Sequence, residues 1–171
     1  MDSQIDKAEL IRRMAQHYND LASLLAKVDD ATLIQPGAVG SWSLKDMVAH
    51  LIAHEQRALR ELEAAKRGEQ IVEGGLSTDE FNARFVAESA SRSGKVMLMA
   101  WGASFRQLLN SVGTLDESAF APDSAVIQAL GDSIDGAVAN ISYLHYAEHL
   151  PEVRAWLAKV SPAADAPQKA E

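Results

Sequence analysis

The sequence predicts an all-α protein built as a bundle of four main helices. Apolar residues recur at steps of three and four along most of the chain, and no stretch keeps the alternation of a strand. The 171 residues, 47% of them hydrophobic, suffice for one domain with a sizeable core. We therefore expect a single helical-bundle domain over residues 1–160 and a disordered tail over 161–171, where the sequence is SPAADAPQKAE.

The first two helices have clear limits. An apolar stripe of about six turns defines the first helix, and its members are Ile5, Ala8, Ile11, Ala15, Tyr18, Ala22, Leu25 and Val28. The stretch QPGAVGSW, residues 35–42, interrupts this pattern with one proline and two glycines. Ser43 with Asp46 three residues later forms a capping-box pattern, so a second helix should begin there. We expect it to extend to about Arg67 and to end at Gly68.

The second half of the chain predicts two more long helices. Ser77 or Thr78 can cap a third helical segment that extends to about Val112, with Gly94 and Gly102 as weak points. GTLDESAFAPDS, residues 113–124, is expected to form a loop or a short turn of helix.

The last long helix should begin between Ala125 and Ser133 and end near Val160. Pro151 lies inside it and should kink the helix or restart it.

Charge and cysteine content exclude several classes of function. The formal charge of -8 opposes nucleic acid and anionic membranes, so we expect neither as a partner. The N-terminal MDSQIDKAEL lacks the apolar segment of a signal peptide, and no apolar run reaches membrane-spanning length, which indicates a cytoplasmic protein. Without cysteine, any thiol used in chemistry has to come from outside the chain.

Two histidines in the last helix are the most unusual feature of the sequence. His145 and His149 occupy a row otherwise made of apolar residues. Two buried imidazoles one turn apart leave several polar nitrogens to satisfy. Histidines at this spacing can bind one divalent cation together, but such pairs also occur as ordinary hydrogen-bonding residues. Spacing alone does not decide between these interpretations.

A metal site would need a third ligand, and the second helix offers two. His50 and His54 are again four residues apart, and periodicity does not choose between them. Three protein ligands would leave an open, reactive position. Next to them, Glu55 interrupts an apolar row at a position where a carboxylate is costly unless it is paired or used.

Two motifs resemble the DinB/YfiT-like superfamily: GSWSLKDMVAHL, residues 40–51, and HYAEHLPEVRAWL, residues 145–157. The resemblance implies an up-down-down-up four-helix bundle, a homodimer and one divalent metal ion, nickel or zinc. Carried over position by position, the metal ligands would be His50, His145 and His149. His54 departs from the family pattern and is expected to line the pocket, whereas Glu55 matches an acid frequent at that place.

The same resemblance implies a metal-dependent enzyme that acts on a small-molecule substrate, as a thiol S-transferase or as a hydrolase. A low-molecular-weight thiol would then be a co-substrate, and the ion would lower its pKa. Glu55 or His54 would move protons as the catalytic groups. FNARFVAESA, residues 81–90, resembles small resistance proteins that open a strained ring in a genotoxin by adding water.

Two other functions compete with this one. The first is a small-molecule binding or sequestering protein with a structural metal ion or none. The second is an interaction protein whose bundle only dimerises.

Overall fold

The computed structural model describes residues 5–71 and 75–160, and over these residues it is all-α with no strand. The predicted tail, 161–171, lies outside the described residues. The four long helices are α1 (Lys7–Leu25), α3 (Leu44–Lys66), α5 (Gly94–Gly113) and α8 (Tyr143–Val160). Between them lie α2 (Asp30–Leu33), α4 (Thr78–Glu88), the 3₁₀ helix η1 (Glu117–Phe120), α6 (Ala125–Leu130) and α7 (Ile134–Ala139).

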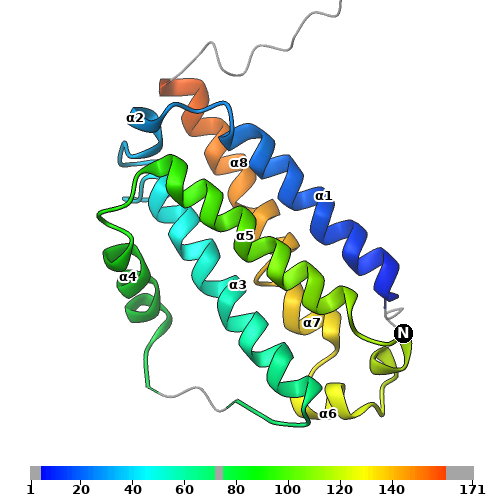
Figure 1. Cartoon of the computed structure of the whole chain (residues 1–171). Helices are drawn as coiled ribbons and strands as arrows, with labels where there is room; N and C mark the ends of the chain where they lie inside the picture. The colour runs from blue at the N-terminus through cyan, green and yellow to red at the C-terminus, as the bar shows by residue number, and fades with distance from the viewer. Residues whose placement is uncertain (1–4, 72–74, 161–171) are drawn as a thin grey trace, which may run out of the picture.

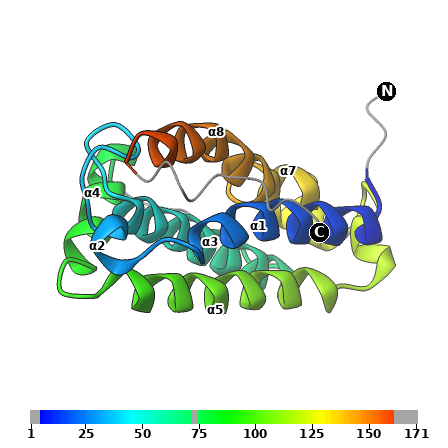
Figure 2. The ribbon, with the colours of Figure 1, turned by 90° about the horizontal axis from the view of Figure 1, so that it is seen from above.

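The long helices form the predicted up-down-down-up bundle. In Figure 1, α3 and α5 run side by side in one direction, whereas α1 and α8 run in the other. Helix α4 lies in the connection that brings the chain back, so that α5 can start at the same end as α3 (Figure 1). Helix α3 packs on α5, and α1 packs on both α5 and α8. Seen from above, α8 and α5 lie on opposite sides of the molecule with α1 and α3 between them (Figure 2).

The second helix begins and ends where its sequence signals place it. The Ser43 hydroxyl accepts a hydrogen bond from the backbone N–H of Asp46, and the Asp46 carboxylate accepts one from the N–H of Ser43. This capping box satisfies two donors that the helix itself leaves unpaired. The helix ends at Lys66, and Gly68 follows with a φ of 71° that suits glycine. The capping box therefore fixes the residue at which α3 begins, and with it the face of the helix on which each later side chain lies.

The third predicted segment is two helices instead of one. Helix α4 ends at Glu88, and α5 begins at Gly94 with the Ser93 hydroxyl as its cap. A Cβ at Gly94 would lie 2.5 Å from the Cβ of Leu33, so glycine lets α2 approach the start of α5 closely. The residue that looked like a weak point within a helix is therefore the point where a helix begins.

The last predicted helix is also divided. Helix α6 ends at Leu130 and is followed by Gly131, which has a φ of 71°. Helix α7 ends at Ala139, so the long helix α8 begins only at Tyr143. The sequence predicts a kink or a restart at Pro151, but α8 continues through this residue without a break. No helix within 5–71 and 75–160 combines the length and apolar character needed to cross a membrane.

Candidate metal centre

Three buried histidines meet between α3 and α8. His50 comes from α3, and His145 and His149 come from α8. Each offers a ring nitrogen, and these three atoms all lie within 4.8 Å of one another. The Nε2 atoms of His50 and His145 are 2.8 Å apart. The side chains are only 7%, 9% and 8% exposed. The structure thus brings together the three histidines that the family resemblance gave as ligands.

The local fold explains this convergence. His50 lies in the second turn of α3, whose start is fixed by the Ser43 cap. His145 and His149 lie one turn apart on the face of α8 that also buries Val153 and Trp156. Residues four apart on a helix project from the same face, so both α8 imidazoles are directed at α3.

Asn82 on α4 orients two histidines, and the sequence analysis did not identify it. Its side-chain oxygen lies 2.9 Å from Nδ1 of His50 and 3.0 Å from Nε2 of His54. A carbonyl oxygen only accepts hydrogen bonds, so both of these nitrogens carry the proton. His50 is therefore left with an unprotonated Nε2 that faces His145. A polar residue between Phe81 and Phe85 was the only local signal, and it does not reveal a contact 32 residues away.

Glu152 has the corresponding position beside His149. Its carboxylate lies 3.2 Å from Nδ1 of His149, one helical turn away on α8. A carboxylate that accepts this proton leaves Nε2 of His149 free to donate its electron pair. Carboxylate or carbonyl partners of this kind are the usual companions of metal-binding histidines.

The residues present fit a divalent ion. Two buried nitrogens, Nδ1 of His145 and Nε2 of His149, have no hydrogen-bond partner. A buried polar atom without a partner is costly, and a cation relieves that cost for an imidazole lone pair. Three imidazole nitrogens are a donor set that suits both zinc and nickel.

Burial also keeps the imidazoles in the form that binds metals. Loss of solvent, with electrostatic repulsion from the neighbouring His54 as a second cause, lowers the pKa of His50 to about 4. Loss of solvent and the neighbouring imidazoles lower the pKa of His145 to about 3. Both side chains are therefore neutral at neutral pH, and a metal ion has no proton to displace from them.

His54 lies next to this cluster and lines a pocket, as expected. Its ring centroid is 4.5 Å from that of His50 and 5.3 Å from that of His145. Its Nε2 is directed at Asn82, and its ring also contacts Phe81 edge to face at 5.4 Å. His54 therefore separates the three-histidine cluster from the pocket that it lines.

Glu55 lies in the apolar core and is fully buried. Its carboxylate accepts hydrogen bonds from Trp101 Nε1 at 2.7 Å and from the Tyr146 hydroxyl at 2.5 Å. Burial raises the pKa of Glu55 to about 7, and hydrogen bonding to Ser104, Tyr146 and Trp101 partly opposes this rise. The carboxylate thus joins α3 to α5 and α8 through two aromatic side chains.

The bundle and its site define a protein of the DinB/YfiT-like superfamily. More particularly, the chain belongs to the family of the mycothiol maleylpyruvate isomerase N-terminal domain, whose family profile matches residues 14–141. This is 128 of the 171 residues. The matched part contains His50 and Asn82, whereas His145 and His149 lie beyond it.

Several solved structures share the fold. DfsB, described as a sibling lethal factor precursor, has a TM-score of 0.79 at 16% identity, covering 92% of this chain and 98% of its own. The colibactin self-resistance protein ClbS, in complex with a dsDNA, has a TM-score of 0.74 at 14% identity, with coverages of 88% and 94%. An uncharacterised protein from Escherichia coli UTI89 has a TM-score of 0.70 at 15% identity, with coverages of 91% and 94%. The comparison with curated proteins finds no match.

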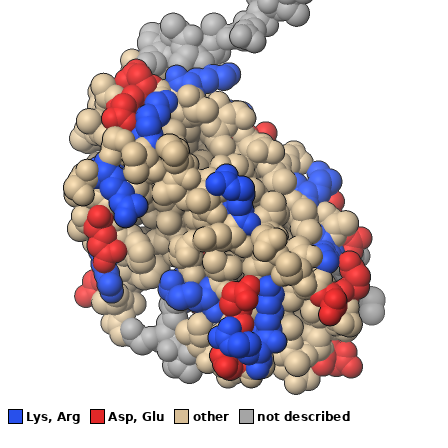
Figure 3. All heavy atoms as spheres, viewed as in Figure 1, with Lys and Arg blue, Asp and Glu red and all other residues tan. Residues whose placement is uncertain are grey.

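The expectation of no nucleic-acid partner is wrong for proteins of this fold, because ClbS was crystallised with a dsDNA. The expectation was drawn from the net charge of -8, which is an average over the whole chain. Figure 3 shows that basic and acidic side chains lie beside one another on the face drawn, so local charge differs from the average. Net charge alone therefore excludes no nucleic-acid contact.

Proposed function

We propose that this protein is a metal-dependent enzyme acting on a small molecule, in which His50, His145 and His149 hold one divalent ion, nickel or zinc. The observation that carries the proposal is the meeting of three buried imidazoles whose nitrogens lie within 4.8 Å of one another. Structural cores rarely place three such groups together, because each brings polar atoms that need partners.

The chemistry follows from this donor set. A divalent ion held by three protein ligands lowers the pKa of a thiol or a water molecule at its open position. Asn82 and Glu152 hold the imidazoles of His50 and His149 in the orientation and proton state that ligation needs. Transfer of a low-molecular-weight thiol is the reaction we favour, and the family description with its mycothiol supports it. Hydrolysis is the second reaction that the site could perform.

His54 and Glu55 are the two candidates for moving protons. His54 lies between the cluster and the pocket, where a substrate proton is within reach. Glu55 is enclosed by Trp101 and Tyr146, so we propose that it acts through Tyr146, which neighbours His145 in α8. We also propose a homodimer, on the strength of the family resemblance, and a cytoplasmic location.

Metal content of protein purified without a histidine tag tests the proposal. About one divalent ion per chain is expected, and His145→Ala should abolish its retention. His54→Ala is the matched control and should keep the ion, because Nε2 of His54 is directed at Asn82. A wild-type chain that takes up neither zinc nor nickel would refute the proposed centre.

A sequestering protein is the second candidate function. The pocket beside His54, of about 600 Å³, could hold a small molecule whether or not an ion is bound. ClbS is described as a self-resistance protein, and its complex with a dsDNA adds nucleic acid to the ligands to be tried. A thermal-shift screen of thiols and electrophiles identifies candidate ligands. Turnover of well more than one ligand molecule per chain then separates an enzyme from a binding protein.

A further inference from the structure

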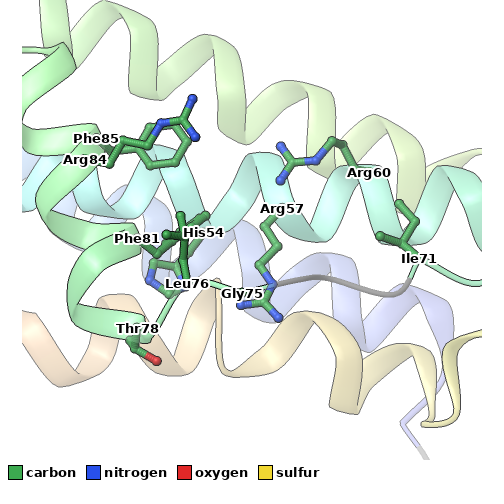
Figure 4. Close-up of a pocket in the computed structure, with 10 residues that line it drawn as sticks. All are labelled: His54, Arg57, Arg60, Ile71, Gly75, Leu76, Thr78, Phe81, Arg84 and Phe85. Atoms are coloured by element: carbon green, nitrogen blue, oxygen red, sulfur yellow. The ribbon is translucent and has the colours of Figure 1, made fainter.

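Another hollow lies on a face of the bundle away from the candidate metal centre. The pocket beside His54, whose lining residues are drawn in Figure 4, belongs to the site already described. The other hollow is a groove between α1 and α5, two helices that pack on one another and run in opposite directions (Figures 1 and 2). Its volume of about 400 Å³ is within the range of small-molecule sites.

Most of this groove is apolar. Ala22 and Ala26 line it on the side of α1, and Leu98 and Met99 line it on the side of α5. Met99 is 75% exposed, whereas Trp101 closes the floor and is buried. Figure 3, which has the viewpoint of Figure 1, shows a largely uncharged surface over the middle of α1 and α5. The groove therefore offers apolar surface that a ligand can remove from water.

Two hydrogen-bond donors converge at one end of the groove. A Cβ at Gly102 would lie 3.1 Å from the hydroxyl oxygen of Tyr18 and 3.3 Å from Nη1 of Arg106. Because Gly102 has no side chain, the space between the two donors is open. Within the described residues Arg106 has no ion pair or hydrogen bond, and the groove has no acidic lining residue. A guanidinium next to a hydroxyl suits a carboxylate, which accepts several hydrogen bonds.

The order of residues along the two helices separates this polar end from an apolar end. Tyr18, Ala22 and Ala26 follow one another at steps of four, so they lie in one row on α1. On α5, which runs in the opposite direction, the lining passes from Arg106 to Leu98. The row on α1 is about 12 Å long, at 1.5 Å per residue. An anion bound at the polar end can thus extend an unbranched chain along the groove.

We propose that the groove between α1 and α5 binds an unbranched aliphatic carboxylate, with its carboxylate at Arg106 and Tyr18 and its chain along the apolar row toward Ala26. Arg106 is the one basic residue among the described lining residues, which matches a ligand with a single negative charge. An anionic membrane or an acidic peptide, with many charges, fits this groove less well. The site is separate from the metal centre and does not depend on the function proposed above.

Calorimetric titration with three probes tests the two requirements: octanoate, its neutral amide octanamide, and acetate. We expect octanoate to bind at least about tenfold more tightly than octanamide, because a hydrogen bond to a charged group is worth roughly that factor. Acetate should bind at least about tenfold more weakly than octanoate, because it lacks the apolar chain. Equal affinity for octanoate and octanamide, or no binding of octanoate, would overturn the proposal.

Variants locate the bound carboxylate. Arg106→Gln should weaken octanoate binding at least about tenfold and remove the preference over octanamide, and Tyr18→Phe should weaken it about two- to tenfold. Arg106 is exposed, so the fold should tolerate its replacement. Arg154→Gln, at an exposed position of α8 outside the groove, is the matched control and should have no effect. Unchanged binding in Arg106→Gln would contradict the assignment.

Further measurements separate this groove from the metal centre and from other occupants. His145→Ala should bind octanoate as the wild type does, and a loss of binding there would place the carboxylate at the metal centre. Sedimentation with phosphatidylglycerol vesicles that depends on Arg106 would make a membrane the occupant. A wild-type dimer that Met99→Asp converts to a monomer would make a second copy of the chain the occupant. Each of these three results would overturn the proposal.

Discussion

At Asn82 a single amide oxygen accepts hydrogen bonds from two histidines. It fixes the proton of His50 on Nδ1 and so leaves Nε2 available for a metal ion. Replacing Asn82 with alanine should therefore weaken metal affinity by about 10- to 100-fold without removing a ligand. Competition with a chelator of known affinity measures the change.

Asn110→Ala, at an exposed position of α5, is the control for loss of an amide. The role assigned to Asn82 would be refuted by an Asn82→Ala variant that keeps the wild-type affinity.

Glu55 makes the stability of the protein depend on pH. Its pKa is raised from an ordinary 4.5 to about 7, so the folded state binds its proton more tightly than the unfolded state does. The stabilisation is complete below pH 4.5 and is lost as pH rises through 7. Linkage puts this loss at about 3 kcal/mol of unfolding free energy.

Urea unfolding of wild type and Glu55→Gln across pH 4 to 8 isolates this contribution, because the amide stays neutral and can still accept from Trp101 and Tyr146. The variant should gain stability over wild type as pH rises through about 7. Glu117→Gln, on η1 and exposed, controls for the loss of one negative charge. A stability difference between wild type and Glu55→Gln that does not change with pH would contradict this role of Glu55 in stability. Full metal content with full turnover in Glu55→Gln would remove Glu55 from the mechanism.

At the scale of the helices, Gly94 sets how closely α2 and α5 approach. An alanine there would bring its Cβ within 2.5 Å of Leu33 Cβ, an atom too close to the backbone to move aside easily. We expect Gly94→Ala to destabilise the fold by about 1–3 kcal/mol, despite the better helix propensity of alanine.

Gly113→Ala is the matched control at the other end of α5, where nothing lies within 4 Å of the new atom. It should stabilise slightly, by up to about 1 kcal/mol. Urea midpoints measure both changes, and a stable Gly94→Ala variant would show that the two helices can separate without cost.

The sequence predicts helices better where a cap marks the limit than where a break has to be inferred. The capping box at Ser43 and the stop at Gly68 placed α3 correctly. The start of α5 was missed because Phe85 and Val96, on either side of the mostly polar residues 88–95, are spaced as on one continuous helix. The turns before Tyr143 were missed for the same reason: local periodicity does not report where the chain changes direction.

The candidate site follows the same rule. His145 and His149 were recognisable from one helix, because their spacing and apolar surroundings are local properties. The choice of His50 over His54 depended on the family resemblance, and Asn82 depends on a contact across the bundle. Interactions between distant segments are what a single sequence does not display.

At the scale of the whole molecule, an ion bound to the three histidines would link α3 to α8. Ligands that bind only the folded state stabilise it, by about 2.7 kcal/mol when the free ion is at a hundred times its Kd. Chelation should therefore lower the Tm of the wild-type protein, and His145→Ala should be insensitive to the same treatment. A wild-type Tm that is unchanged when measured metal is removed would place the ion outside this interface.

The distance along the chain between the ligands has a consequence for biogenesis. His145 follows His50 by 95 residues, and the two meet only after α8 has docked on the other helices. During synthesis, the ribosome presents His50 long before its partners exist, so no complete site is available to a growing chain. Metal acquisition would thus be a step of maturation that follows translation of α8, and the supply of ions would govern how many finished molecules become active.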